Sequence, residues 1–423
     1  MCEMKDSGIE WIGQIPKDWD VVPHKRVMHK VKKICEQYSG EDIISLTMNG
    51  VIKRDLTAGG KMPTSFDGYQ YVKPNDLLLC LFDIDVTPRC VGVVKDYGVT
   101  SPAYSRFVMH DGYYNAYYDY LLRAIDDDKV FVHLSKNLRS SLTESDFGAI
   151  KTCVPSLAEQ KRIVTFLDAQ CAEIDAVLEK TRASIEEYKK LKQAVITQAV
   201  TKGVRGDRPM KDSGIEWIGE IPAEWEVLNL VAHTSMLTPM RDRPENLDGP
   251  IPWVRIEDFE GKYIESSKAG LGVSMKTVKE MNLKVYPVGT ILCTSSCIMG
   301  KCAIVSRELV SNQRFIGIIP DRTTDKTYLY YLMTSNAERM NFLSTGALQA
   351  NLSRSAFEHL KVQFPPYSEQ QEIAAYLDDK CADIDALVAK KQQYLTEIEN
   401  YKKSLIYEYV TGKKEVKTSV LAN

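Results

Sequence analysis

Residues 155–201 read PSLAEQKRIVTFLDAQCAEIDAVLEKTRASIEEYKKLKQAVITQAVT, and a second version of this stretch begins at Pro365 as PPYSEQQEIAAYLDDKCADIDALVAKK and ends at Thr411. A constant offset of 210 residues (365 − 155) aligns the two versions without a gap. The offset pairs Glu159 with Glu369, Asp168 with Asp378, Cys171 with Cys381, Asp175 with Asp385 and Val200 with Val410. A repeat of this length fixes the domain organisation before any other feature is considered.

Each version has the composition and periodicity of one long helix, because proline precedes it and neither proline nor glycine interrupts it. Apolar residues recur at steps of four and three, which is typical of a coiled-coil seam. At 1.5 Å per residue, about 40 residues form a rod of roughly 60 Å. We expect the two helices to pack on each other; the alternative is that each packs in a separate core. The predicted seam is Leu167, Cys171, Ile174, Leu178, Ile185, Tyr188 and Val195 with Leu377, Cys381, Ile384, Val388, Leu395, Ile398 and Leu405.

A second, shorter repeat opens each half of the chain. Residues 4–16 read MKDSGIEWIGQIP and residues 210–222 read MKDSGIEWIGEIP, with a tryptophan three residues after each. Such a segment is too short to fold alone, and its aromatic residues favour docking onto a larger element. We call these segments strap 1 and strap 2, and the repeated helix is their expected partner.

Between strap and helix lie two dissimilar segments, each rich in short β-like runs punctuated by turns. A weak echo relates residues 74–80 to residues 287–293, so we expect two domains of one mixed α/β fold with different surfaces. The expected divisions are strap 1 at 1–19, a first domain at 20–154, a first long helix at 155–203, a linker with strap 2 at 204–225, a second domain at 226–364, a second long helix at 365–412 and a tail at 413–423.

The composition is that of an ordinary soluble protein long enough for two or three domains: 423 residues, 44% hydrophobic, 26% charged, with a formal net charge of −3. This balance excludes a wholly basic nucleic-acid coat but not local basic patches. The opening residues lack a signal-peptide pattern, and no apolar run approaches membrane-spanning length. With ten cysteines, we therefore expect a cytoplasmic protein with reduced thiols and no membrane association.

No pattern of catalytic or metal-binding residues is present. Cys293, Cys297 and Cys302 are close in sequence, but their spacing differs from paired CxxC ligands, so we expect buried strand cysteines instead of zinc. There is no GxxxxGK[ST] loop. Residues 364–367, Phe-Pro-Pro-Tyr, are similar to a methyltransferase loop, but Phe364 replaces the polar residue and no glycine-rich cofactor loop precedes it. We interpret them as the entry to the second helix and expect no enzyme activity and no cofactor.

Two rounds of strap, variable domain and long helix resemble the DNA-specificity subunit of a type I restriction–modification system. The resemblance is carried by the duplicated KDSGIEWIG-x-IP strap, by the helix entries SLAEQKRIV and YSEQQEIAA, and by the helix cores DAQCAEIDA and DDKCADIDA. It covers nearly the whole chain. It implies an α/β (α+β) protein in which two target-recognition domains, separated by two antiparallel coiled-coil helices, form an internal pseudo-two-fold repeat.

The resemblance also implies partners. Each recognition domain would read one half of a bipartite, asymmetric sequence in double-stranded DNA, and the helices would fix the separation of the halves. Two copies of a DNA adenine methyltransferase subunit would bind the helices, and a translocating endonuclease subunit would join them. The alternative from another class is a protein–protein scaffold whose two variable domains bind peptides or proteins.

DNA contacts are expected from basic residues in polar, turn-like surroundings of the variable domains. For any one of them, an ordinary solvated surface charge is the competing interpretation. The candidates are Lys53, Arg54, Lys61, Arg89, Arg106, Lys136 and Arg139 in the first domain and Arg241, Arg243, Lys268, Lys276, Lys279, Lys301, Arg314 and Arg354 in the second. Neighbouring polar residues, among them Ser295, Ser296, Asn312, Gln313, Gln349 and Asn351, could reach base edges.

Overall fold

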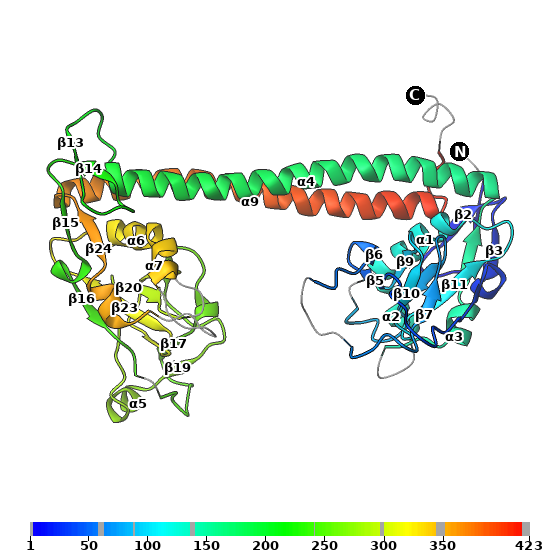
Figure 1. Cartoon of the computed structure of the whole chain (residues 1–423), viewed down its shortest axis with the longest axis horizontal. Helices are drawn as coiled ribbons and strands as arrows, with labels where there is room; N and C mark the ends of the chain where they lie inside the picture. The colour runs from blue at the N-terminus through cyan, green and yellow to red at the C-terminus, as the bar shows by residue number, and fades with distance from the viewer. Residues whose placement is uncertain are drawn as a thin grey trace. The chain divides into compact units, whose positions relative to one another are not determined.

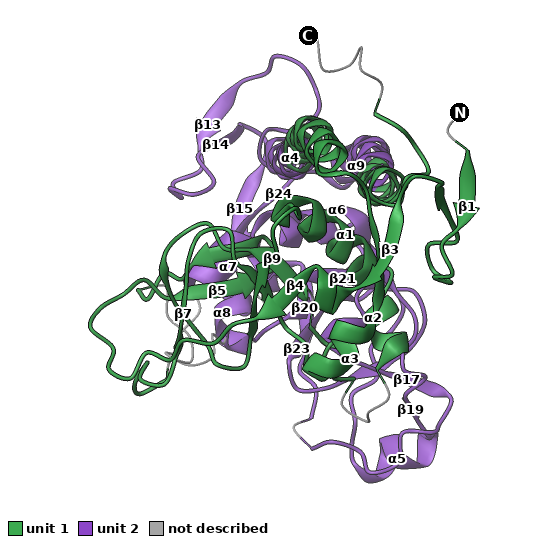
Figure 2. Cartoon of the chain, turned by 90° about the vertical axis from the view of Figure 1, so that its right-hand side faces the viewer, with its two compact units in different colours: residues 1–182, 393–423 green, residues 183–392 purple. Residues whose placement is uncertain are grey.

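The computed structural model describes residues 3–57, 63–87, 89–135, 140–240, 242–296, 300–343 and 352–416. They form two compact units, residues 1–182 with 393–423 (unit 1) and residues 183–392 (unit 2), coloured separately in Figure 2. Each unit holds one globular domain and part of both long helices. Unit 1 therefore combines the beginning of the chain with its last residues.

The two predicted long helices are α4 (Leu157–Lys202) and α9 (Tyr367–Val410) (Figure 1). In each unit a segment of α4 runs antiparallel to a segment of α9. Lys402 bonds Asp175 in unit 1, with the ammonium nitrogen 2.7 Å from the carboxylate. Lys192 bonds Asp385 at 2.6 Å in unit 2, which the 210-residue offset makes the equivalent pair.

The predicted seam residues lie between the two helices. Leu167, Leu178 and Ile185 of α4 are at most 4% exposed. Toward the end of α4 the buried positions move to Ile196 and Val200, while the predicted Val195 is only half-buried. A straight helix with 3.6 residues per turn drifts out of a strict seven-residue repeat, which accounts for the shift. The remaining seam residues of α4 and all those of α9 are buried or half-buried.

The unit 1 domain has an antiparallel sheet in the order β4-β11-β8-β9 and the pairs β5-β6, β7-β10 and β3-β12. Helix α1 packs against β9, and its buried tyrosines and leucines join this domain to α4 and α9 in one core. The elements are β1 (Met4–Asp6), β2 (Gln14–Pro16), β3 (Asp20–Pro23), η1 (His24–Arg26), β4 (Met28–Lys30), β5 (Ile44–Thr47), β6 (Gly50–Lys53), β7 (Gln70–Val72), β8 (Leu77–Leu79), β9 (Val91–Val93), β10 (Gly98–Thr100), β11 (Ser105–Met109), α1 (Asn115–Asp127), α2 (Val130–Leu134), α3 (Glu144–Ala149) and β12 (Lys151–Val154).

The unit 2 domain has a five-stranded sheet, β16-β23-β20-β21-β18, a three-stranded sheet, β19-β17-β22, and the pair β15-β24. Helix α6 packs on β20 and β21. The elements are β13 (Met210–Asp212), β14 (Glu220–Pro222), β15 (Glu226–Asn229), η2 (Leu230–Ala232), β16 (Thr234–Leu237), β17 (Ile251–Val254), η3 (Ile256–Asp258), β18 (Tyr263–Ile264), β19 (Gly272–Val273), α5 (Met275–Glu280), β20 (Ile291–Thr294), β21 (Cys302–Val305), β22 (Val310–Ser311), β23 (Phe315–Pro320), α6 (Lys326–Ser335), α7 (Ala337–Leu343), α8 (Arg354–Glu358) and β24 (Lys361–Phe364).

The two domains share the order β4-β11-β8-β9 and β16-β23-β20-β21, so the predicted common fold is present. The turns before β8 and β20 correct the sequence echo between them. The amides of Asn75 and Gly289 donate to the carbonyls of Val94 and Val305, and both residues have positive φ (75° and 91°). Asn75 therefore corresponds to Gly289, and the echo is displaced by one residue. Within the described residues, no helix is long and apolar enough to cross a membrane.

One core position holds a titratable histidine, His24, in unit 1 and a leucine, Leu230, in unit 2. The amide of His24 donates to the Ile150 carbonyl, as the amide of Leu230 does to the Leu360 carbonyl. His24 is completely buried and stacks on Phe147, where Leu230 presents only hydrocarbon. Burial lowers the pKa of His24 to about 4 from its usual 6.5.

Acid should therefore destabilise unit 1 through His24. The unfolded state takes up a proton below pH 6.5 and the folded state only near pH 4, so stability falls as the pH drops through this window. Between pH 6.5 and pH 5 the loss is about 2 kcal/mol. His24→Leu should remove this part of the pH dependence in urea denaturation. An unchanged difference between the two pH values in the variant would contradict the assignment.

Candidate DNA interface and its scaffold

The first turn of each long helix contains a glutamate that accepts a hydrogen bond from the tryptophan following a strap. Trp19 Nε1 donates to Glu159 Oε2 (3.0 Å), and Trp225 Nε1 donates to Glu369 Oε2 (3.1 Å). Both indoles are at most 1% exposed, so each ring N–H needs such an acceptor. The predicted docking of the strap segments onto the repeated helix is confirmed at this contact. Burial raises the pKa of the Glu159 carboxyl.

The next residue of each helix positions the recognition domain. Gln160 Oε1 accepts from the amide of Tyr114, and Gln370 Oε1 accepts from the amide of Asp325, both at 2.8 Å. Tyr114 and Asp325 are the N-cap residues of α1 and α6. The Nε2 of each glutamine donates to the proline carbonyl five residues earlier (2.9 Å in both). The Glu-Gln pair of each helix entry thus joins strap, helix and domain.

Two aspartates in each helix core complete the scaffold. Asp168 accepts a hydrogen bond from Tyr120 of α1, and Asp378 accepts one from Tyr331 of α6, both at 2.7 Å. The second aspartate, seven residues later, holds the lysine of the opposite helix described above. One carboxylate therefore binds the recognition domain and the other binds the partner helix. The sequence repeat marked these residues but not their roles, because their partners lie between 47 and 227 residues away along the chain.

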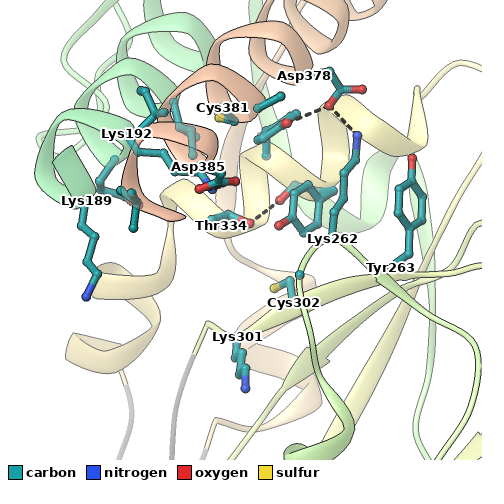
Figure 3. A pocket seen from close by; sticks show the side chains of 18 of the residues that line it. Lys189, Lys192, Lys262, Tyr263, Lys301, Cys302, Thr334, Asp378, Cys381 and Asp385 are labelled. Atoms are coloured by element: carbon teal, nitrogen blue, oxygen red, sulfur yellow. Dashed lines mark hydrogen bonds and ion pairs between the residues drawn. The ribbon is translucent and has the colours of Figure 1, made fainter. Parts of the chain in front are cut away.

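A cavity of about 680 Å³ lies between the recognition domain and the helices of unit 2 (Figure 3). It is lined by Lys189, Lys192, Lys262 and Lys301 together with tyrosines and two aspartates. Lys192 is paired with Asp385, and Lys262 with Asp378. These carboxylates neutralise two of the cations at the junction between the domain and the helices.

Four of the predicted DNA contacts, Lys61, Lys136, Arg139 and Arg241, lie outside the described residues, as do Gln349 and Asn351. Lys53 and Arg54 are exposed at the end of β6. Lys53 lies 2.8 Å from Asp42, and this carboxylate raises the pKa of the Lys53 ammonium.

Two of the candidates in the first domain have guanidinium groups that face the protein. Arg106 Nε lies 2.6 Å from Asp76 Oδ2, and the two side chains are only 8% and 2% exposed. Arg89 Nε donates to the Val91 carbonyl (2.8 Å), and burial lowers the pKa of its guanidinium. Polar neighbours along the sequence suggested solvent exposure for both, but the partner that pairs with Arg106 lies thirty residues earlier.

In the second domain the described candidates are exposed, and two of them meet at the end of β20. The carbonyls of Lys301 and Arg314 accept from the amides of Thr294 and Ser295, so the two residues flank this strand end. The amide of Arg314 donates to Asn312 Oδ1 (3.1 Å). The other exposed candidates are dispersed: Arg243 beside Trp253, Lys268 beside Glu260, Lys276 and Lys279 on α5, and Arg354 paired with Glu358.

The cysteines and the Phe-Pro-Pro-Tyr segment occupy core and helix-entry positions. Cys293 and Cys302 face each other across β20 and β21, with their sulfur atoms 2.6 Å apart, whereas Cys297 lies outside the described residues. Phe364 ends β24 and Tyr367 begins α9, which confirms the helix-entry interpretation. In the described part of the chain no three His, Cys, Asp or Glu side chains gather as metal ligands would.

Comparisons with known proteins agree with this architecture. Residues 226–399 match the family model described as the type I restriction modification DNA specificity domain. The MjaIX specificity subunit of Methanocaldococcus jannaschii is 35% identical over 173 residues, which are 38% of this chain and 40% of that subunit. The putative MjaX specificity subunit of the same organism is 25% identical over 435 residues, 96% of each chain.

Two solved structures share the fold. A chain from a structure on complex assembly and conformational transition of the type I R-M system has a TM-score of 0.73 at 14% identity, covering 95% of this chain and 99% of that one. The HsdS subunit from Thermoanaerobacter tengcongensis has a TM-score of 0.50 at 14% identity, covering 95% and 98%. Together these comparisons indicate a class, the DNA-recognition subunits of restriction–modification systems. Within it, the chain is similar to the type I specificity subunits.

Proposed function

We propose that the two recognition domains read the two halves of a bipartite, asymmetric DNA target. The proposal depends on one observation: two domains of the same topology but different surfaces are attached to the helices by equivalent contacts. These contacts come from Glu159, Gln160 and Asp168 in one half and from the equivalent residues in the other. Among the described residues, a three-stranded sheet such as β19-β17-β22 is present in unit 2 and not in unit 1. Identical half-sites would require identical readers, so unlike domains predict unlike half-sites.

Of the basic residues considered as DNA contacts, we retain those whose side chains are exposed. Lys53 and Arg54 remain in the first domain, and Lys301 and Arg314, which flank the end of β20, remain in the second. Asn312, which orders the backbone at Arg314, is the polar residue placed beside this group. Lysine and arginine would neutralise phosphates, while side-chain amides pair with base edges.

The outer faces of the helices support two copies of a methyltransferase subunit as partners. Each helix has apolar residues outside the seam at the same repeat positions: Val177 and Leu191 on α4, and Leu387 and Tyr401 on α9. All four are at least 40% exposed. Exposed apolar side chains at helical spacing are typical of a docking surface for other helices. Two equivalent surfaces on one chain fit two copies of one partner, which a translocating endonuclease subunit would join.

We further propose that this chain has no catalytic activity of its own and acts in the cytoplasm. The eight described cysteines are buried free thiols, as a reducing compartment allows. Purified chain with S-adenosylmethionine and DNA should yield no N6-methyladenine, whereas the chain with its methyltransferase subunit should. Methylation by the isolated chain, reproduced with independent preparations, would contradict this assignment.

Exchange of one domain tests the bipartite model. Replacing residues 20–154 with the matching segment of a relative should change one half-site and leave the other and the spacer unchanged, because the contacts of unit 2 are untouched. The measurement is the methylated motif found by single-molecule sequencing of host DNA. Simultaneous change of both half-sites would contradict the model, and loss of all methylation with an intact complex would favour a protein-binding scaffold.

A further inference from the structure

The two straps have almost the same sequence but not the same environment. In strap 1, Ile9 and Ile12 are 7% and 2% exposed and belong to the core of unit 1. In strap 2, the equivalent Ile215 and Ile218 are only half-buried, and Trp217 is 42% exposed. Figure 1 shows the hairpin β13-β14 standing out from the helix end of its unit. A near-identical surface is therefore covered in one unit and open in the other.

Strap 1 is covered by the end of α9 and the residues that follow it. Tyr407 Oη donates to the Trp11 carbonyl (2.8 Å), and Lys413 Nζ donates to the Ile12 carbonyl (2.6 Å) and to the Gln14 carbonyl. Val416 is 7% exposed in the same core. The occupant of strap 1 is thus a helix end with a tyrosine, followed by a lysine and an aliphatic residue.

Strap 2 lacks these groups within its own unit. The repeat offset places Thr197 where α9 has Tyr407. Gly203 follows α4 and Gly412 follows α9, both with positive φ (+76° and +71°), so the two glycines are equivalent. The residue after each is then also equivalent, and Val204 occupies the position that Lys413 has in unit 1. Among the described residues, no side chain donates to the carbonyl of Trp217 or Ile218.

The single difference between the straps favours a cation at the open site. Glu220 replaces Gln14, the residue whose carbonyl accepts from Lys413 in strap 1. The Glu220 side chain is exposed, and it forms no ion pair with the part of the chain that the structure describes. The Glu220 carboxylate adds a negative charge to the residue whose carbonyl would accept from an ammonium group bound as Lys413 is.

A neighbouring aromatic surface extends the open site. The guanidinium of Arg339 stacks on Trp217 at 3.8 Å from the ring centroid and lies 4.9 Å from the ring of Phe342, which is 77% exposed. Arg339 covers one face of the indole. Large exposed aromatic residues around a polar acceptor site are common at protein interfaces.

We propose that strap 2 is a docking site for a helix end of another subunit of the complex, one that brings a lysine to the Ile218 and Glu220 carbonyls and an aliphatic side chain to Ile215 and Ile218. The site goes beyond the proposed DNA reading and does not depend on it. The chain itself shows the occupant's chemistry, because strap 1 binds such a segment in the same polypeptide.

The test uses a peptide of residues 399–416 as the probe. In calorimetry the full chain should bind one peptide, at strap 2, because its own tail fills strap 1. A chain ending at residue 398, which lacks the helix end that fills strap 1, should bind two. Lys413→Met in the peptide should weaken binding about tenfold, since a charge-assisted hydrogen bond contributes roughly 1.5–3 kcal/mol. Glu220→Gln, which converts strap 2 to the sequence of strap 1, should weaken it by a smaller factor.

The matched control is a variant whose own α4 end should occupy strap 2 and so compete with the peptide. Thr197→Tyr with Val204→Lys gives α4 the donors that α9 has, so this variant should bind no peptide. Failure of the full chain to bind while the shortened chain binds one peptide would overturn the proposal. If neither chain binds, hydrogen exchange decides: amides 215–219 should slow when the complex assembles, and unchanged exchange there overturns the proposal. Neither readout involves DNA, so the proposed function is tested separately.

Discussion

A variant with one heptad inserted after Thr181 and another after Lys391 is expected to recognise both unchanged half-sites across a spacer longer by roughly one to three base pairs. Seven residues lengthen a helix by about 10 Å, and one base pair rises about 3.4 Å. Bending of the duplex and the turn of its grooves can absorb part of this gain. The measurement is the methylated motif of cells carrying the variant.

The two insertion points keep the seam paired. Lys391 lies over the ring of Tyr188, seven residues after Thr181, so the inserted heptads fall on neighbouring segments of the antiparallel pair. The ion pair between Arg182 and Glu399 is lost, but both side chains are about half exposed and such pairs contribute below about 1 kcal/mol. Four residues inserted in α4 alone should abolish activity, because they rotate the seam away from α9. An active heptad variant with its original spacer would show that the helices do not set the distance.

Asp76→Ala should destabilise unit 1 by about 3–5 kcal/mol, because it leaves the Arg106 guanidinium buried without its counter-charge. The same carboxylate accepts from the Lys73 amide (2.7 Å) in the turn before β8. The loss should appear as faster hydrogen exchange of the β8 and β11 amides, which report this unit alone.

The matched control removes both charges. Asp76→Leu with Arg106→Met should lie within about 1 kcal/mol of the parent, since hydrophobic replacement of a buried pair is often neutral. In the second domain the position equivalent to Arg106 is occupied by an uncharged residue. Gly317 faces Leu292 as Arg106 faces Leu78, and the Tyr286 ring occupies the space in front of Gly317. A double variant as unstable as Asp76→Ala would mean that the pair has a role beyond mutual neutralisation.

The features predicted from sequence are those specified by repetition and periodicity. The helices follow from a heptad pattern sustained over both copies, and the docking of Trp19 follows from a strap too short to fold alone. What could not be predicted depends on partners distant in sequence. Arg106 has the sequence surroundings of a surface residue until Asp76 is placed beside it. The one-residue displacement of the echo depends on the left-handed backbone of Asn75, which periodicity does not encode.

The core of unit 1 combines residues from both ends of the chain, which affects the order in which the two domains fold during translation. Its core includes Leu405, Ile406 and Val410, and the Val410 carbonyl accepts a hydrogen bond from Tyr117 (2.8 Å). A ribosome releases these residues after residues 183–392 of unit 2. The recognition domain translated first therefore keeps part of its apolar surface uncovered until residues 405–410 have emerged, and the domain translated second can complete its packing before it. In chains that end at residue 400 and have been released from the ribosome, proteases should cut the first domain and spare the second.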